Sequence, residues 1–255
     1  MANYHFEAYA ISRGNRKPTR RSVAKRLNYI TGLRLHDPYF AETYDRGRSD
    51  ILDYRIFLPD GSPAEYYDLQ HLCDEIEGHE HRTNSQTAMC YTASLPNELS
   101  MQEKIRIVEE YVQEYFLPYG LCVIASIHNR GKNDPEQRNP HVHFVVPFRR
   151  VGSDGFYGNK DRENNRKERL QELREGWADI VNRAYERNNC PERVSHLSLE
   201  AQGEDREPKK YLPPAELWRL RDQDRSRCYT QEQELNKEKK APSRDIPSLA
   251  EGRSR

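Results

Sequence analysis

The sequence has few cysteines, and none of them is closely spaced with another. Cys73, Cys90, Cys122, Cys190 and Cys228 are scattered along 255 residues without a CxxC pattern. A cysteine-based zinc module needs closely spaced thiolates, and a disulfide framework needs many cysteines in a short chain. The pattern therefore implies neither of these two classes.

Long apolar segments are also missing from the chain. No apolar run approaches the roughly 20 residues needed to cross a bilayer, and the N-terminus lacks the apolar core of a signal peptide. We therefore expect a soluble cytoplasmic protein without membrane insertion.

The chain lacks a net charge, because 41 lysines and arginines balance 41 aspartates and glutamates. Bulk charge therefore does not indicate a nucleic-acid partner, but eight basic residues and no acidic ones lie between Ser12 and Arg34. Such a segment either attracts a phosphate backbone or is simply a solvated basic surface. The candidates for phosphate contacts are Arg20, Arg21, Lys25 and Arg26.

Hydrophobic residues make up 35% of the chain and charged residues 32%, which favours one core with solvated segments around it. We expect a single domain over residues 1–212. After Leu212 the sequence continues with two prolines and an end rich in Lys, Glu, Pro and Ser. Because this composition cannot bury a core, residues 213–255 are predicted to form a charged tail that is partly helical or disordered.

Hydrophobic periodicity predicts alternating strands and helices. Residues 4–11 have the pattern of a strand, and a helix follows Ser22, with Tyr29 near its end and Gly32 as its stop signal. Tyr29 is therefore expected where the backbone opens toward a cleft. Further strands are predicted over residues 51–58, 87–95, 121–128 and 141–148, and further helices around residues 69–76, from 100 toward 120, and over 165–188.

Three histidines form a candidate metal site. His141 and His143 are two residues apart on a predicted strand, so both rings lie on one face of the sheet. His128 ends the preceding strand, and antiparallel pairing of the two strands brings its ring beside the others. Three neutral imidazoles can hold a divalent metal with open positions, although histidines on strands are also often hydrogen-bonded core residues.

Several motifs in this chain follow one another in an order that is typical of a known family. They are Tyr4 to Ser12 as an opening strand, Arg21 to Gly32 as a tyrosine helix, Leu95 to Ser100 as LPxELS, Asn139 to His143 as NPHxH after His128, and Ser198 to Pro208 as SxxxQGxxxxP. With them the chain resembles the MobA/MobL family of plasmid mobilisation relaxases over roughly residues 2–215.

The resemblance implies an α+β fold, in which an antiparallel sheet is flanked by helices in the circularly permuted order of a HUH endonuclease. It implies a site- and strand-specific DNA transesterase that acts at an origin of transfer and leaves a 5′-phosphotyrosine and a free 3′-OH. Tyr29 would be the nucleophile, and His128, His141 and His143 would hold a divalent metal ion, Mg or Mn. The implied partners are single-stranded origin DNA, accessory relaxosome proteins and a coupling protein.

Two other functions are compatible with the same residues. In a rolling-circle replication initiator or a transposase the tyrosine follows the HxH motif on a helix, and Tyr185 would then be the nucleophile. A non-catalytic DNA-binding descendant of a relaxase is the second alternative. It is suggested by Cys90, Tyr91 and Thr92, which stand in a strand where many members of the family carry glutamates.

Overall fold

The computed structural model describes residues 4–14, 21–130 and 139–205. The chain divides after Leu197 into two units. Residues 198–205 belong to the second unit, where the amides of Gln202, Gly203 and Glu204 close local turns. The candidate Arg20 and the predicted tail over residues 213–255 lie outside the described residues.

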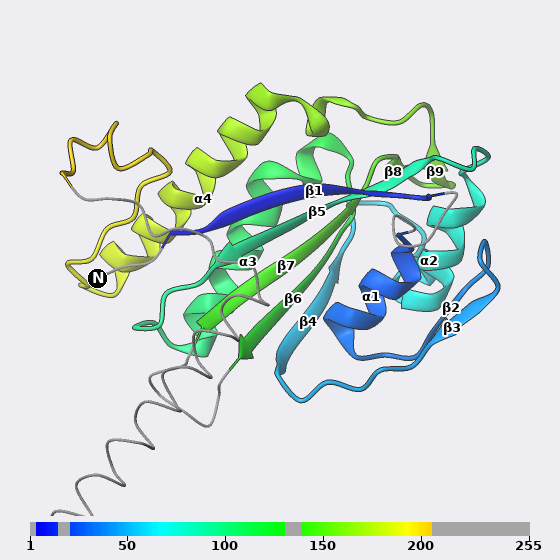
Figure 1. The fold of residues 1–255 in the computed structure, drawn as a ribbon, viewed down its shortest axis with the longest axis horizontal. Helices are drawn as coiled ribbons and strands as arrows, with labels where there is room; N and C mark the ends of the chain where they lie inside the picture. The colour runs from blue at the N-terminus through cyan, green and yellow to red at the C-terminus, as the bar shows by residue number, and fades with distance from the viewer. Residues whose placement is uncertain (1–3, 15–20, 131–138, 206–255) are drawn as a thin grey trace, which may run out of the picture. The chain divides into compact units, whose positions relative to one another are not determined.

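A five-stranded antiparallel sheet forms the centre of the first unit, with strand order β1-β5-β7-β6-β4 (Figure 1). Its strands are β1 (Phe6–Ser12), β4 (Ile51–Phe57), β5 (Gln86–Ser94), β6 (Val123–Arg130) and β7 (Asn139–Pro147). Two short pairs accompany it: β2 (Leu35–Asp37) with β3 (Glu42–Tyr44), and β8 (Arg150–Gly152) with β9 (Gly155–Tyr157). The predicted antiparallel pairing of the two histidine strands is confirmed, and β7 lies in the middle of the sheet.

Helices cover both faces of this sheet (Figure 1). They are α1 (Val23–Thr31), α2 (Leu69–Gly78), α3 (Met101–Tyr115) and α4 (Lys167–Arg187), with 3-10 turns at Ala64–Tyr67, Leu117–Tyr119 and Glu163–Asn165. The predicted α+β architecture, an antiparallel sheet flanked by helices, is confirmed. In the described part of the chain, no helix combines the length and apolarity needed to span a membrane.

Alternation along β7 divides the core into two layers. Val142, Phe144 and Val146 are buried against α3 and α4, where Phe144 contacts Trp177. Val145 points to the other face and is buried with residues of α1 and α2. The histidines of β7 lie on this second face because they occupy the same alternate positions as Val145.

Capping residues fix both ends of α1, as the sequence predicts. The Ser22 side chain accepts a hydrogen bond from the Lys25 amide at 3.0 Å, which satisfies one of the free donors of the first turn. At the other end, the amide of Gly32 donates to the Asn28 carbonyl while its φ of 72° is in the left-handed region. These caps determine where Tyr29 leaves the helix.

The predicted end of α3 was wrong. The helix begins as expected, with Ser100 accepting from the Glu103 amide, but it ends at Tyr115 rather than near Gly120. Pro118 has no amide hydrogen with which to continue the helix. A separate 3-10 turn follows, and Gly120, with a φ of 74°, ends that turn instead.

Candidate active site

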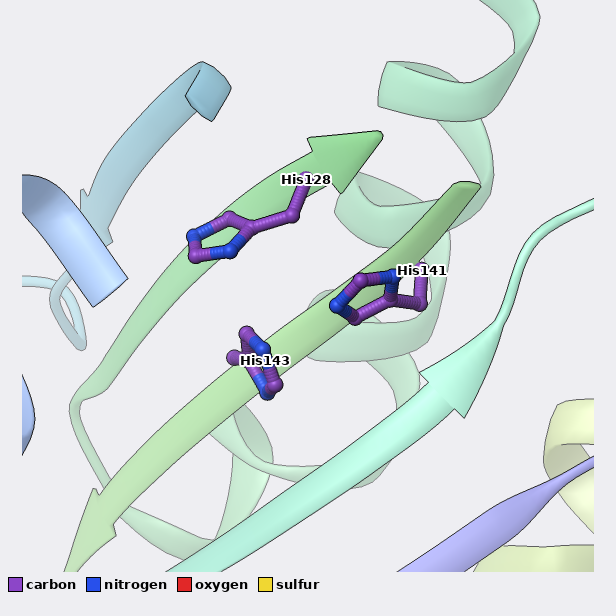
Figure 2. Close-up of side chains that lie close together, drawn as sticks. All are labelled: His128, His141 and His143. Atoms are coloured by element: carbon purple, nitrogen blue, oxygen red, sulfur yellow. The ribbon is translucent and has the colours of Figure 1, made fainter. Parts of the chain in front are cut away.

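His128, His141 and His143 lie on the face of the sheet that carries α1, and their rings converge (Figure 2). The register pairs His128 with His141 directly across β6 and β7. The ring centroids are 4.7 to 5.6 Å apart, and one nitrogen from each ring lies within 4.8 Å of the others. The structure therefore brings the three predicted ligands into one cluster that could hold a metal ion.

Hydrogen bonds leave one ring nitrogen free on two of these histidines. Nε2 of His128 donates to the carbonyl oxygen of Ile30 at 2.8 Å, so the lone pair is on Nδ1, which is buried without a partner. Nδ1 of His141 donates to the Asn139 carbonyl at 2.7 Å, which leaves its Nε2 as the acceptor. A backbone carbonyl that fixes the tautomer of a histidine in this way is typical of metal sites.

His143 has a different environment. Its Nδ1 lies 2.9 Å from Nη2 of Arg26 and 2.9 Å from Oγ1 of Thr92. Its Nε2 is buried and has no hydrogen-bond partner. A buried ring nitrogen without a partner, next to the lone pairs of His128 and His141, fits the donor set of a divalent transition metal.

The surroundings of the three rings keep them neutral. Burial lowers the pKa of His128 to about 4. Burial also lowers the pKa of His141, and burial together with the Arg26 charge lowers that of His143 much further. Only neutral imidazole can coordinate a metal, so near neutral pH all three rings have the charge state that coordination requires.

The metal-free protein is expected to lose stability as the pH falls from about 6.5 to about 4. Above pH 6.5 the His128 ring is neutral in both the folded and the unfolded protein. Between pH 6.5 and 4 the ring takes up a proton in the unfolded chain but stays mostly neutral in the folded protein. The folded state therefore loses on the order of 3 kcal/mol from His128 by pH 4. Urea denaturation of the wild type and His128→Gln across this range measures the effect. A stability difference between the two proteins that does not change with pH would contradict it.

Tyr29 lies in the last turn of α1, beside the histidine cluster. Its ring centroid is 5.8 Å from that of His143 and 6.2 Å from that of His128, and 39% of the residue is exposed. The Ser126 hydroxyl donates to the carbonyl of Ile30, which also accepts from His128. The end of α1 is thus tied to β6, and a solvent-accessible phenol is held next to the three imidazoles.

Arg48 adjoins Tyr29 and is paired with Asp50, although no motif in the sequence predicts either residue. The guanidinium carbon of Arg48 lies 4.0 Å from the Tyr29 ring centroid, and its Nε donates to Asp50 at 2.8 Å. Two hydrogen bonds raise the pKa of Arg48. The one to Asp50 has the larger effect, and the one to the Tyr29 hydroxyl adds to it. Arg48 therefore places a permanent positive charge against the phenol.

A groove of about 480 Å³ includes Tyr29 in its lining and is formed by residues of β1, of α1 and of the two positions before α1. Its lining residues are Glu7, Tyr9, Ile11, Arg21, Ser22, Lys25, Arg26 and Tyr29. The Tyr9 ring lies near two guanidinium groups, with its centroid 5.1 Å from the guanidinium carbon of Arg21 and 5.8 Å from that of Arg26. The structure thus gathers Arg21, Lys25 and Arg26 along one groove with Tyr29.

Tyr185 lies away from this cluster. It is 1% exposed in the core beneath α4, and its hydroxyl donates to Oε2 of Glu98 at 3.3 Å. This core is on the face of the sheet opposite to the histidines. The fold does not bring the alternative nucleophile to the histidine cluster.

Comparison with known proteins gives consistent matches. The model of the MobA/MobL family matches residues 21–217. The probable mobilization protein MobA of Bifidobacterium longum (strain NCC 2705) is 30% identical over 251 residues, which cover 82% of this chain and 42% of that protein. Mobilization protein MobL of Acidithiobacillus ferridurans is 24% identical over 244 residues, which cover 84% of this chain and 63% of that protein.

One solved structure is also similar over most of the chain. It is described as "Molecular Basis of Vancomycin Resistance Transfer in Staphylococcus aureus". The two have a TM-score of 0.68 and 26% sequence identity, over 77% of this chain and 100% of that chain. This chain spans less than two thirds of the length of the curated relatives it matches.

Proposed function

Because the chain belongs to the MobA/MobL family, we propose that residues 1–212 form a relaxase domain that cuts and rejoins one DNA strand at an origin of transfer. The reaction would proceed through a 5′-phosphotyrosine and support conjugative mobilisation. The observation that carries this proposal is the position of Tyr29, whose exposed ring lies 5.8 Å from the ring of His143 in the histidine cluster.

In this mechanism Oη of Tyr29 attacks the scissile phosphorus. The Oη–P bond forms and the P–O3′ bond breaks; the phenol gives up its proton, and the departing O3′ gains one. The phosphotyrosine conserves the energy of the phosphodiester, so attack by the same 3′-OH reverses the reaction without ATP or an organic cofactor. Arg48 would hold the phenol oxygen and offset the negative charge that develops on it.

The histidine cluster would hold the divalent ion, through Nδ1 of His128 and the Nε2 atoms of His141 and His143. When bound, this ion supplies Lewis-acid polarisation of a non-bridging phosphate oxygen, worth several kcal/mol of the barrier. Magnesium and manganese are the proposed physiological ions. Three imidazoles favour transition metals over magnesium, so Mn²⁺ is the better probe for binding experiments.

The proposed substrate is single-stranded or extruded DNA, because Tyr29 must reach a backbone that is not sealed in a duplex. The groove next to Tyr29 combines three cationic side chains with the Tyr9 ring, which is the combination that single-strand binding surfaces use. Accessory relaxosome proteins and a coupling protein are proposed as further partners, from the family alone.

Replacing Arg21 or Lys25 by alanine is expected to weaken binding to single-stranded DNA and to flatten its salt dependence. Each lost phosphate contact should reduce the slope of log K against log salt concentration by about 0.7. Fluorescence anisotropy with a labelled oligonucleotide at several salt concentrations measures both effects. Arg106→Ala is the matched control, because Arg106 lies on α3, on the opposite face of the sheet, where it pairs with Glu110. An equal loss of slope in this control would argue against the groove.

A further inference from the structure

Nδ1 of His143 has two hydrogen-bonding neighbours, one that can only donate to it and one that can donate or accept. Arg26 can only donate, so its contact at 2.9 Å requires a lone pair on Nδ1. The Thr92 hydroxyl, at the same distance, can donate to this lone pair, or it can accept from Nδ1 when Nδ1 carries the proton. Arg26 alone therefore selects the tautomer with the lone pair on Nδ1, and Thr92 can follow either form.

The tautomer decides whether His143 can coordinate a metal. With Arg26 on Nδ1, the ring proton is on Nε2, the buried nitrogen without a hydrogen-bond partner, and no lone pair is available there. With Nδ1–H donated to Thr92, Nε2 carries the lone pair. Arg26 thus favours the form that rejects a metal ion, whereas Thr92 can stabilise the form that accepts one by accepting from Nδ1–H.

Arg26 is also placed to contact DNA. It lines the groove beside Tyr29, and its guanidinium carbon is 5.0 Å from the Tyr29 ring centroid. Its Nε is buried without a hydrogen-bond partner, so the bond to His143 leaves one of its donors unused. A phosphate is a stronger acceptor for guanidinium than a neutral imidazole, because the hydrogen bond is charge-assisted on both sides. Thr92, by contrast, is fixed opposite His143 by the β5–β7 register.

We propose that Arg26 is a positioning residue that holds His143 in the metal-rejecting tautomer until a DNA phosphate draws the guanidinium away, whereupon Thr92 stabilises the metal-accepting tautomer. This inference rests on the proposed function, in that the cluster binds a metal and the groove binds DNA. Its consequence is that metal and DNA bind with positive cooperativity, each raising the affinity for the other by the same factor.

Calorimetric titration of the full chain with Mn²⁺, alone and with saturating single-stranded dT12, tests the coupling. In the wild type, dT12 should lower the Kd for Mn²⁺ about tenfold, within the usual range of coupling between two sites. Arg26→Gln should bind Mn²⁺ about tenfold more tightly without DNA and show no further gain with it. Thr92→Val, which removes the acceptor, should weaken Mn²⁺ binding by about tenfold or more.

Lys25→Gln provides the matched control. It removes the same charge from the same groove, but Lys25 faces the Tyr44 ring and not His143. It should need more dT12 to reach saturation and yet keep the wild-type coupling. If Lys25→Gln and Arg26→Gln tighten Mn²⁺ binding equally, the effect is general electrostatics and the proposal fails. Circular dichroism establishes that each variant is folded.

Nitrogen-15 spectra of the histidine rings report the tautomer directly. Metal-free wild type should carry the His143 proton on Nε2, and Arg26→Gln should carry it on Nδ1. A proton on Nδ1 in the metal-free wild type would overturn the proposal. If the wild type binds Mn²⁺ but Arg26→Gln does not differ from it, the coupling fails while the proposed function stands. If the wild type does not bind Mn²⁺ at all, the metal site itself fails.

Discussion

Tyr29→Phe is expected to abolish the covalent protein–DNA adduct, with a fall in its rate of formation of at least about 10³-fold. The substitution keeps the aromatic ring and its contacts with His128, His143 and Arg48, and removes only the attacking oxygen. The affinity for single-stranded DNA should therefore stay within about threefold of the wild type, because the groove keeps its cationic side chains. Denaturing gels of the protein with an origin oligonucleotide and Mn²⁺ measure adduct formation.

Tyr185→Phe is the control for this experiment. It also removes one tyrosine hydroxyl, but from the core beneath α4, where its acceptor is Glu98. We expect adduct formation at close to the wild-type rate. An adduct that survives Tyr29→Phe and disappears in Tyr185→Phe would reverse the assignment and favour a replication initiator or a transposase.

His141→Ala is expected to give the second largest effect, a loss of adduct formation of about 10² to 10³-fold at fixed Mn²⁺ concentration. It removes one of three metal ligands, and several kcal/mol of barrier depend on the ion. EDTA should have the same effect on the wild type, and excess Mn²⁺ should restore activity to the wild type in full. His141 is only partly buried, so the variant should fold.

His36→Ala separates the loss of a ligand from the loss of a histidine as such. His36 lies on β2, is exposed, and contacts the Thr43 hydroxyl. Its replacement should leave both Mn²⁺ binding and the rate of adduct formation unchanged. Adduct formation that resists EDTA and His141→Ala alike would exclude the cluster from catalysis.

The histidine cluster could be predicted from the sequence because its determinants are local. A spacing of two residues on a strand puts His141 and His143 on one face, and a single pairing of neighbouring strands adds His128. The ends of α1 were also predictable, since Ser22 and Gly32 act on their own helix.

The residues that complete the site depend on contacts distant in sequence. Thr92 meets His143 only through the register of β5 with β7, and Arg48 reaches Tyr29 from the segment before β4. No periodicity or motif encodes either contact. The short strands of β2, β3, β8 and β9 were missed for a related reason, because three residues are too few to establish an alternating pattern.

The basic stretch before Tyr29 illustrates the limit of counting charges. Arg13 belongs to that stretch, yet it is buried, donates to the carboxylate of Glu77 and also bonds the Glu80 carbonyl. The guanidinium of Arg13 is therefore paired inside the fold and is not available to bind a phosphate. Arg21, Lys25 and Arg26 line the groove instead, so only part of the local field predicted from composition faces the proposed substrate.

Peptide mapping of the adduct identifies the residue that attacks the DNA. The wild-type protein is incubated with Mn²⁺ and a panel of single-stranded origin-of-transfer oligonucleotides, and the adduct is digested with nuclease and trypsin. We expect a nucleotide bound to the tryptic peptide of residues 27–34, whose only tyrosine is Tyr29. A nucleotide on the peptide of residues 184–187, which contains Tyr185, would contradict it. So would stable DNA binding without an adduct for any oligonucleotide, the result expected of a non-catalytic descendant.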